Sequence, residues 1–242
     1  MRLLSVPHHL DERLDPFDLG VPADAFVTAD LPPGDLWARM AVLYEQVAGA
    51  IGAERVVVAS GDCTTSLGVL AGLQRAGRDV GVVWFDAHAD FHTDATTTSG
   101  YLGGMPLALA VGRGDLTLPR ALGLRPVLES RVVLVDARDT DPGEQLLLAD
   151  SAVTRSTVAD LPGVVPDGEL YVHVDVDVVD LPGLRYPAPG GVSVDELLSA
   201  VRALVATGRV AAVGLAATWH HRFPAAPAHR ELVRGLLAAL AG

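Results

Sequence analysis

The sequence predicts an α/β fold, a doubly wound three-layer sandwich with a mainly parallel central sheet. Strand-like and helix-like segments alternate along the chain, which is typical of repeated βα units. The expected strands are largely apolar, as strands buried on both faces of a parallel sheet are. Clusters of polar side chains fall where these strands end, and such sheets bind their ligands there. These three observations together favour this class of fold.

Five segments are expected to form strands because they are short apolar runs rich in β-forming residues. In chain order they are residues 55–60, 80–86, 131–136, 169–175 and 209–217. Residues 91–104, rich in glycine, threonine and serine, are expected to form a long loop after the second strand.

Four segments are expected to form helices between or after these strands: residues 64–75, 106–111, 193–206 and 228–241. Thr64 or Thr65 is expected to cap the first helix, and Pro106 favours the start of the second. No linker, repeat or low-complexity segment interrupts the pattern. The chain, residues 1–242, is therefore expected to form a single α/β domain.

The composition narrows the class of partner. Half of the 242 residues are hydrophobic, which supplies a core, yet no apolar run approaches the length of a membrane span. A net charge of −12 disfavours nucleic acid and anionic membranes as partners. A single cysteine excludes an internal disulfide, and the apolar stretch at the N-terminus is too short for a signal peptide. A cytoplasmic setting is therefore expected.

Residues 82–90 and 171–177 carry the strongest functional signal. Each is a run of β-formers with metal-ligand side chains at every second position, namely Asp86, His88 and Asp90 in the first and His173, Asp175 and Asp177 in the second. Successive strand residues point to opposite faces, so each triplet is expected to share one side. An isolated Asp-x-His is more often a surface loop, but two such strand ends favour a pair of divalent cations.

Several segments in this order resemble the motifs of the arginase/agmatinase (ureohydrolase) family. They are residues 60–63 (Ser-Gly-Asp-Cys), 86–90 (Asp-Ala-His-Ala-Asp), 97–100 with 104–106, and 175–180 (Asp-Val-Asp-Val-Val-Asp). Residues 138–144 resemble the arginase branch in particular. The resemblance implies an arginase-like fold with two manganese ions per chain. A hydroxide that bridges these ions attacks the guanidinium carbon, and urea and an amine are released.

The resemblance also implies roles for individual residues. Asp86 and Asp175 would bridge the two ions; His88 and Asp177 would complete the shell of one ion, and Asp90 that of the other. Asp90 is also expected to act in catalysis. His173 stands where the family has a small hydroxyl residue, and it is expected to be a donor behind the metal ligands, a substitute proton shuttle or a core histidine.

The chain departs from the family pattern at the reacting end of the substrate. Cys63 stands where the family has a histidine ligand; it would be a ligand that favours zinc or iron over manganese, or a buried thiol with no metal. Gly103 stands at the place of the family's proton-shuttle histidine. Residues 216–219 (Ala-Ala-Thr-Trp) lack the glutamate that pairs with the guanidinium in arginases.

The residues that hold the amino-acid end are better kept. The resemblance implies that Ser99 contacts the α-carboxylate and that Asp141 meets the α-ammonium through water, while His92 replaces an asparagine. The expected partner is therefore a small guanidino α-amino acid. Nω-hydroxy-arginine, which would give hydroxyurea and ornithine, fits a site with weakened help at the reacting end; arginine would give urea.

Three alternatives stay open from the sequence. The chain could be an agmatinase-type or other ureohydrolase, a degenerate member that binds metal or an amino acid without turnover, or a thiol hydrolase built on Cys63. A homo-oligomer is compatible with the family. His220 and His221 follow the last strand and are expected in a loop, and His8 and His9 are expected at the surface.

Overall fold

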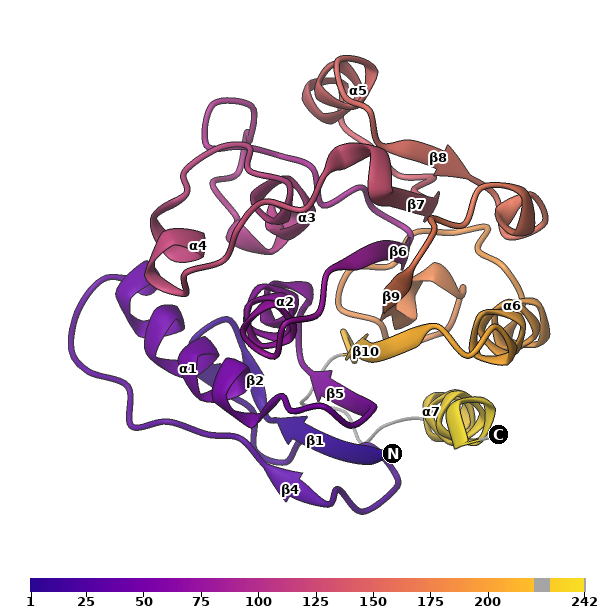
Figure 1. Cartoon of the computed structure of the whole chain (residues 1–242), viewed down its shortest axis with the longest axis horizontal. Helices are drawn as coiled ribbons and strands as arrows, with labels where there is room; N and C mark the ends of the chain where they lie inside the picture. The colour runs from indigo at the N-terminus through magenta and orange to yellow at the C-terminus, as the bar shows by residue number, and fades with distance from the viewer. Residues whose placement is uncertain (220–226, 242) are drawn as a thin grey trace.

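An eight-stranded sheet runs through the protein, with helices on both faces (Figure 1). The structure is a computed structural model, and it describes residues 1–219 and 227–241. The strand order is β4-β1-β5-β10-β9-β6-β7-β8, and every neighbouring pair is parallel. The strands are β1 (Arg2–Val6), β4 (Ala25–Phe26), β5 (Val56–Ser60), β6 (Val80–Asp86), β7 (Val132–Asp136), β8 (Thr154–Ser156), β9 (Glu169–Asp175) and β10 (Val210–Ala216).

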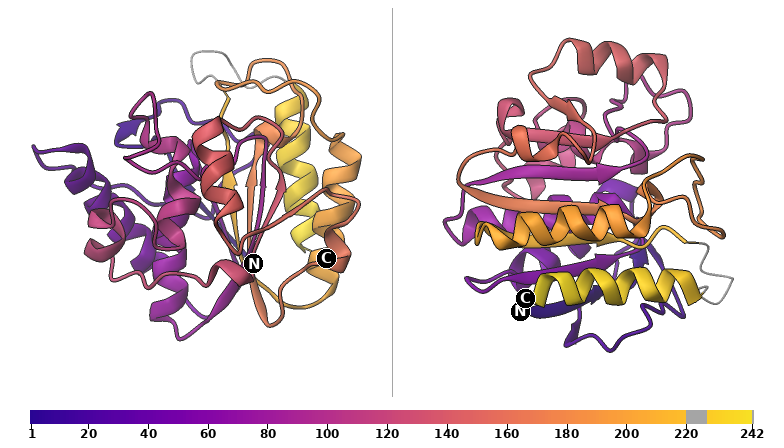
Figure 2. Two further views of the ribbon diagram at one scale, coloured as in Figure 1. Left: turned by 90° about the horizontal axis from the view of Figure 1, so that it is seen from above. Right: turned by 90° about the vertical axis from the view of Figure 1, so that its right-hand side faces the viewer.

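The helices form the two outer layers. They are α1 (Leu36–Ala50), α2 (Ser66–Arg75), α3 (Pro106–Ala110), α4 (Thr117–Ala121), α5 (Pro142–Ala149), α6 (Val194–Ala206) and α7 (Pro227–Ala241). The two views of Figure 2 show α6 and α7 on one face of the sheet, opposite the layer that contains α1 and α2. Each face buries its own apolar cluster against the sheet. The predicted doubly wound three-layer fold is therefore confirmed, and among the described residues no helix combines the length and the apolar character needed to cross a membrane.

The five predicted strands and four predicted helices are all present, with bounds that shift by no more than about two residues. The prediction missed β1, β4 and β8 and the helices α1, α4 and α5. Of these, α1 had a readable signal: Met40, Leu43, Tyr44 and Val47 recur at helical spacing and are buried, and the side chain of Asp35 caps the helix.

The predicted side-chain cap of the helix expected at residues 64–75, which is α2 in the structure, is wrong. A 3-10 turn, Cys63–Thr65, precedes α2, and neither threonine caps the helix with its side chain. Asp62 takes this role for the turn, because its Oδ1 accepts a hydrogen bond from the Thr64 amide at 2.8 Å. Asp62 is the better cap because its carboxylate also accepts from the Leu10 amide at 2.6 Å.

The expectation that His8 and His9 lie at the surface is also wrong. Both belong to a short antiparallel hairpin, β2 (His8–His9) with β3 (Glu12–Arg13), and their exposed fractions are 3% and 5%. The hairpin packs over the end of β5, where the Gly61 amide donates to the His8 carbonyl at 2.8 Å. A Cβ at position 61 would lie 2.6 Å from that carbonyl oxygen, so only glycine permits this approach.

The two strands that carry the predicted ligands lie side by side in the middle of the sheet. β6 pairs with β9 in a register that places Trp84 beside His173 and Phe85 beside Val174. The carboxyl ends of the two strands therefore meet at the same edge, with β10 on the other side of β9.

Candidate active site

A pocket of about 230 Å³ opens at the carboxyl ends of the central strands. It is lined by residues that follow β5, β6, β7, β9 and β10, so the strand ends of the whole central sheet contribute to it. Among the predicted site residues, the pocket is lined by Cys63, Asp86, His88, Asp90, His92, Ser99, Asp141, Asp175 and Asp177. The structure thus gathers all of them except His173 on one surface.

The ligands are aimed by tight turns rather than by continued strands. β6 ends at Asp86 and β9 at Asp175, so the strand alternation on which the prediction relied stops there. Instead, the first aspartate of each motif accepts a hydrogen bond from the amide two residues further on. Asp86 accepts from the His88 amide at 2.8 Å, and Asp175 from the Asp177 amide at 2.9 Å. Such turns bring residues i and i+2 to the same side.

Three of the acids are buried where they are costly to ionise. Burial, followed by the charge of Asp177, raises the pKa of Asp86 to about 6. Burial also raises the pKa of Asp90 and of Asp175 well above the ordinary value, and the neighbouring carboxylates add to this effect. The Oδ2 atom of Asp90 has no hydrogen-bond partner among the described residues. Acids in this state are satisfied by a cation of high charge.

His88 lies between two of these acids, at a position where positive charge is stabilised. Its Nδ1 lies 3.0 Å from Asp177 Oδ2 and 3.6 Å from Asp86 Oδ1. Burial alone would lower the pKa of His88, but the hydrogen bonds to Asp177 and Asp86 outweigh it and raise the pKa to about 12. One ligand atom from each of these three residues lies within 4.8 Å of the other two. A divalent cation would take the place of the proton that His88 holds here.

Cys63 lies among carboxylates rather than in an apolar core. Its Sγ donates to Asp175 Oδ2 at 3.0 Å and lies 3.8 Å from Asp86 Oδ2. Burial, together with the charges of Asp175, Asp90 and Asp86, raises the pKa of this thiol well above its usual range. Without a metal the thiol stays protonated and is a poor nucleophile, which disfavours a thiol hydrolase.

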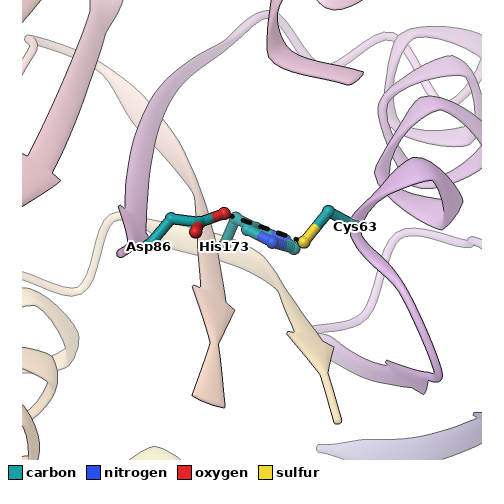
Figure 3. A group of neighbouring side chains, drawn as sticks. All are labelled: Cys63, Asp86 and His173. Atoms are coloured by element: carbon teal, nitrogen blue, oxygen red, sulfur yellow. Dashed lines mark hydrogen bonds between the residues drawn. The ribbon is translucent and has the colours of Figure 1, made fainter. Parts of the chain in front are cut away.

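His173 is buried beside Cys63 and Asp86, and it lies two residues before Asp175 on β9. Figure 3 draws these three side chains, which come from β9, the end of β6 and the turn before α2. One ligand atom from each lies within 4.8 Å of the other two. His173 is 1% exposed and is absent from the pocket lining, which disfavours the substitute-shuttle interpretation.

The three residues predicted for the amino-acid end lie at the rim of the pocket. His92 Nε2 lies 3.1 Å from Asp141 Oδ2, and its Nδ1 lies 3.2 Å from Thr96 Oγ1. Ser99 is exposed on the loop beside them. The arrangement places a hydroxyl, an imidazole and a carboxylate together, and these groups suit the two charged ends of an α-amino acid.

Other side chains lie at the two positions where the family's shuttle histidine and its guanidinium-binding glutamate are missing. A side chain at Gly103 would collide with the phenol of Tyr101, whose hydroxyl lies 2.9 Å from His9 Nε2. At the end of β10, Thr218 lines the pocket and donates from its hydroxyl to Asp175 Oδ1 at 2.5 Å. His220 and His221 lie outside the described residues.

Sequence reasoning missed several residues of the pocket wall. Glu144 is buried there and accepts hydrogen bonds from the amides of Phe91 and Asp141 at 3.0 and 3.1 Å. Tyr101 and Tyr186 form an aromatic wall with ring centroids 5.4 Å apart. Glu144 belongs to a Pro-Gly-Glu helix start, a readable capping signal, whereas nothing in the sequence brings the two tyrosines together.

Comparison with known sequences supports the resemblance inferred from the motifs. The family model described as "Arginase family" matches residues 8–216. An arginase of Bacillus subtilis is 31% identical over 169 residues, which are 63% of this chain and 57% of that protein. An N(omega)-hydroxy-L-arginine amidinohydrolase of Streptomyces lavendulae is 36% identical over 143 residues, 56% of this chain and 50% of that protein. The matches therefore span only about half the length of these curated relatives.

Solved structures agree on the fold. An arginase from Bacillus caldovelox superposes with a TM-score of 0.85, covering 100% of this chain and 99% of that chain at 22% identity. The parallel sheet, the strand ends that carry the acids and the family match over most of the chain lead to one conclusion: this chain belongs to the arginase family.

Proposed function

We propose that this protein is a metal-dependent amidinohydrolase that cleaves the guanidino group of an arginine-like α-amino acid, with Nω-hydroxy-arginine favoured over arginine. One observation carries the proposal. Asp86, Asp90, Asp175 and Asp177 are buried at the floor of one pocket beside the partly exposed His88, and three of these acids have a raised pKa. Ionising such a cluster destabilises the fold unless cations compensate the charge, and carboxylates prefer divalent cations of this kind.

The donor atoms would suit two divalent ions, and Asp86 belongs to both groups of donors. Asp86, His88 and Asp177 would hold one ion with oxygen and nitrogen donors, a set that suits manganese. The other would be held around Asp86 with Asp90, Asp175 and Cys63 at hand. When bound, such ions supply Lewis acidity and lower the pKa of water to near neutrality.

The wall of the pocket favours a substrate that is less basic than arginine. In the described part of the wall, Asp62 and Glu144 are buried acids besides the floor cluster, and each accepts from two backbone amides. At the end of β10, Thr218 offers a hydroxyl in place of a carboxylate. Asp139 and Asp141 also line the pocket, but their carboxylates are largely exposed to solvent. The buried acids of the described wall are thus engaged by amides and the others are solvated, whereas an N-hydroxyguanidine, which is more often neutral, needs less counter-charge.

The reaction itself is a hydrolysis. Water adds its oxygen to the guanidino carbon, the bond from that carbon to the side-chain nitrogen breaks, and that nitrogen receives a proton. Nω-hydroxy-arginine thus gives ornithine and hydroxyurea. In this pocket His92, Ser99 and Asp141 would hold the amino-acid end. Tyr101 also lines the pocket, and its hydroxyl lies within hydrogen-bond distance of His9 Nε2 behind it.

The test measures turnover by the purified protein loaded with manganese. Ornithine is measured as the product from Nω-hydroxy-arginine and from arginine, and putrescine is measured as the product from agmatine. We expect kcat/KM for Nω-hydroxy-arginine to exceed that for arginine at least tenfold. Asp177→Asn should abolish turnover, because it removes a carboxylate from the floor cluster. Asp79→Asn, the same substitution at an exposed aspartate paired with Arg131, serves as the matched control.

Two results would contradict the proposal. A clear preference for arginine or agmatine would assign a different substrate within the family. Tight binding of a guanidino amino acid without any product from a metal-loaded sample would identify a binding protein, which is the degenerate alternative.

A further inference from the structure

We propose that His173 is itself a metal ligand and that Nε2 of its ring completes, with Cys63 and Asp86, the second half of the metal centre. The inference rests on the two-metal centre of the proposed function and names the ligands of its less obvious half. The family pattern has a histidine ligand at the position of Cys63. In this chain the imidazole ligand would come from His173 on β9 instead.

The spacing of the donor atoms fits a shared ion. Sγ of Cys63 lies 3.8 Å from Asp86 Oδ2, and a donor atom of His173 lies within 4.8 Å of both side chains. A tetrahedral ion with bonds of about 2.3 Å to sulfur and about 2.1 Å to oxygen separates those two ligands by about 3.6 Å. The observed separation is close to this value, so little movement is required.

The hydrogen bonds of the ring leave one nitrogen for this purpose. Nδ1 lies 3.0 Å from Ser66 Oγ, whereas Nε2 is buried and has no partner among the described residues. His173 is 1% exposed, and Nδ1 of its ring faces the hydroxyls of Ser66 and Tyr171 rather than a carboxylate. A neutral ring that donates from Nδ1 presents a lone pair at Nε2, which is the form in which histidine binds metals.

The surroundings hold the ring in this orientation. The Trp84 indole stacks on it with centroids 3.7 Å apart and an angle of 26°. The hydroxyl of Tyr171 donates to Ser66 Oγ at 2.7 Å, which fixes the partner of Nδ1. On β10, Gly214 leaves the space, because a Cβ there would lie 3.1 Å from Nδ1. This is a prepared position for an imidazole with one free nitrogen.

The two halves of the centre would then differ in chemistry. The half built on Cys63, His173 and Asp86 offers sulfur, nitrogen and oxygen, a softer set that prefers zinc or iron(II). The half built on Asp86, His88 and Asp177 lacks sulfur and suits manganese. The Cys63 thiol must lose its proton when a metal binds to the half that contains it, so metal binding to this half releases a proton.

The experiment measures metal binding directly, without turnover. Metal-free protein is titrated with Co²⁺, and the thiolate-to-cobalt charge-transfer absorption reports the half that contains Cys63; bound zinc and manganese are counted after dialysis. We expect two equivalents in the unmodified protein. His173→Asn, which keeps an amide near the Nδ1 position but lacks Nε2, should weaken the equivalent that gives the charge-transfer band more than about 100-fold.

The controls separate ligation from packing. Ser66→Ala removes the partner of Nδ1, together with the acceptor of the Tyr171 hydroxyl, and keeps Nε2. It should weaken the same equivalent about 10- to 100-fold, as loss of an outer hydrogen bond does. His88→Asn should remove the other equivalent and keep the charge-transfer band. His229→Asn removes a buried imidazole elsewhere and should keep both equivalents.

Unchanged cobalt spectra and affinities in His173→Asn would overturn the inference. If that variant fails to fold, the unmodified protein decides with one equivalent of zinc: X-ray absorption should show sulfur and imidazole in one shell, and sulfur without imidazole would overturn the inference. Two equivalents of metal that depend on His173 but support no hydrolysis would instead leave this inference standing and reject the proposed function.

Discussion

At the scale of single residues, glycine 214 decides whether β9 can carry two large polar side chains toward the centre. A Cβ at this position would collide with the Tyr171 hydroxyl and press on His173. Gly214→Ala is therefore expected to lower the free energy of unfolding by about 1–3 kcal/mol, the usual cost of overpacking a core, measured by urea unfolding.

A matched control shows that the cost comes from this contact. Gly49, on an exposed turn of α1, has open space around its Cβ position. Gly49→Ala should leave stability unchanged or raise it by about 0.4–1 kcal/mol. Equal effects at both positions would mean that Tyr171 and His173 do not depend on the gap at Gly214.

Position 103 shows a different kind of dependence. Returning a histidine to this place should not restore an arginase-like site, because Tyr101 fills the space and is bonded to His9. Gly103→His alone is expected to lower kcat/KM at least tenfold. In Tyr101→Ala/Gly103→His the collision is relieved, so the double variant should be more active than the two single effects predict, by about 1 kcal/mol or more of coupling. Additive effects in this four-protein cycle would contradict the argument.

At the scale of elements, one short device recurs at three strand ends. After β5, β6 and β9, an aspartate accepts from the amide two residues further on, which involves Asp62, Asp86 and Asp175. Only Asp62 is outside the predicted ligand set, so it tests the device alone. Asp62→Ala leaves the buried amides of Leu10 and Thr64 without their acceptor and should cost about 3 kcal/mol of unfolding free energy.

The comparison is Asp35→Ala, which removes an exposed cap of α1 and should cost only about 1 kcal/mol by the same urea measurement. Asp62→Ala should also weaken metal binding, because the turn that presents Cys63 loses its anchor. A cost no larger than that of the exposed cap would show that the turn holds its shape without Asp62.

The elements also show what sequence could and could not predict. β6 and β9 were predicted at their observed bounds because apolar runs that end in acids leave few alternatives. The predicted ligand set rests on the same acids and, for Cys63, on the family resemblance, and it stays a prediction. The His9–Tyr101 contact could not be predicted, because it joins segments 92 residues apart through a hairpin of two-residue strands. The role of His173 depends on which ring nitrogen Ser66 occupies, and that is a property of packing alone.

At the scale of the whole molecule, the sheet concentrates negative charge at one edge of an already acidic chain. The net charge is −12, and the buried acids of the floor stand at the ends of its central strands. Repulsion between these carboxylates therefore destabilises the fold at this edge unless protons or cations are bound. Stability should consequently depend on both, and in opposite senses.

In the metal-free protein, acid should stabilise the fold. Asp86 has a folded pKa of about 6 against 3.8 for the free group, and the pKa values of Asp90 and Asp175 are also raised. The folded state thus binds more protons than the unfolded state, and stability falls as the pH rises through about 4 to 6. His88, with a pKa raised to about 12, adds stability that is complete below 6.5 and declines above it. Burial lowers the pKa of His173 to about 3 and also lowers the pKa values of His8, His9 and His229, so these four histidines oppose this effect below 6.5. We expect the floor acids and His88 to outweigh them, because the pKa values of Asp90 and Asp175 are raised well above the ordinary value and that of His88 rises to about 12.

Bound metal should reverse the slope, because its ligands must be deprotonated and protons compete with it. We expect the Tm of chelator-treated protein to rise by roughly 5 °C or more between pH 8 and pH 5, since each kcal/mol is worth about 2–4 °C at this size. Over the same interval the Tm of metal-saturated protein should fall, and the two curves should converge at the acid end where the metal is displaced. Parallel curves in a calorimeter, with and without metal, would show that the buried acids are compensated by something other than cations.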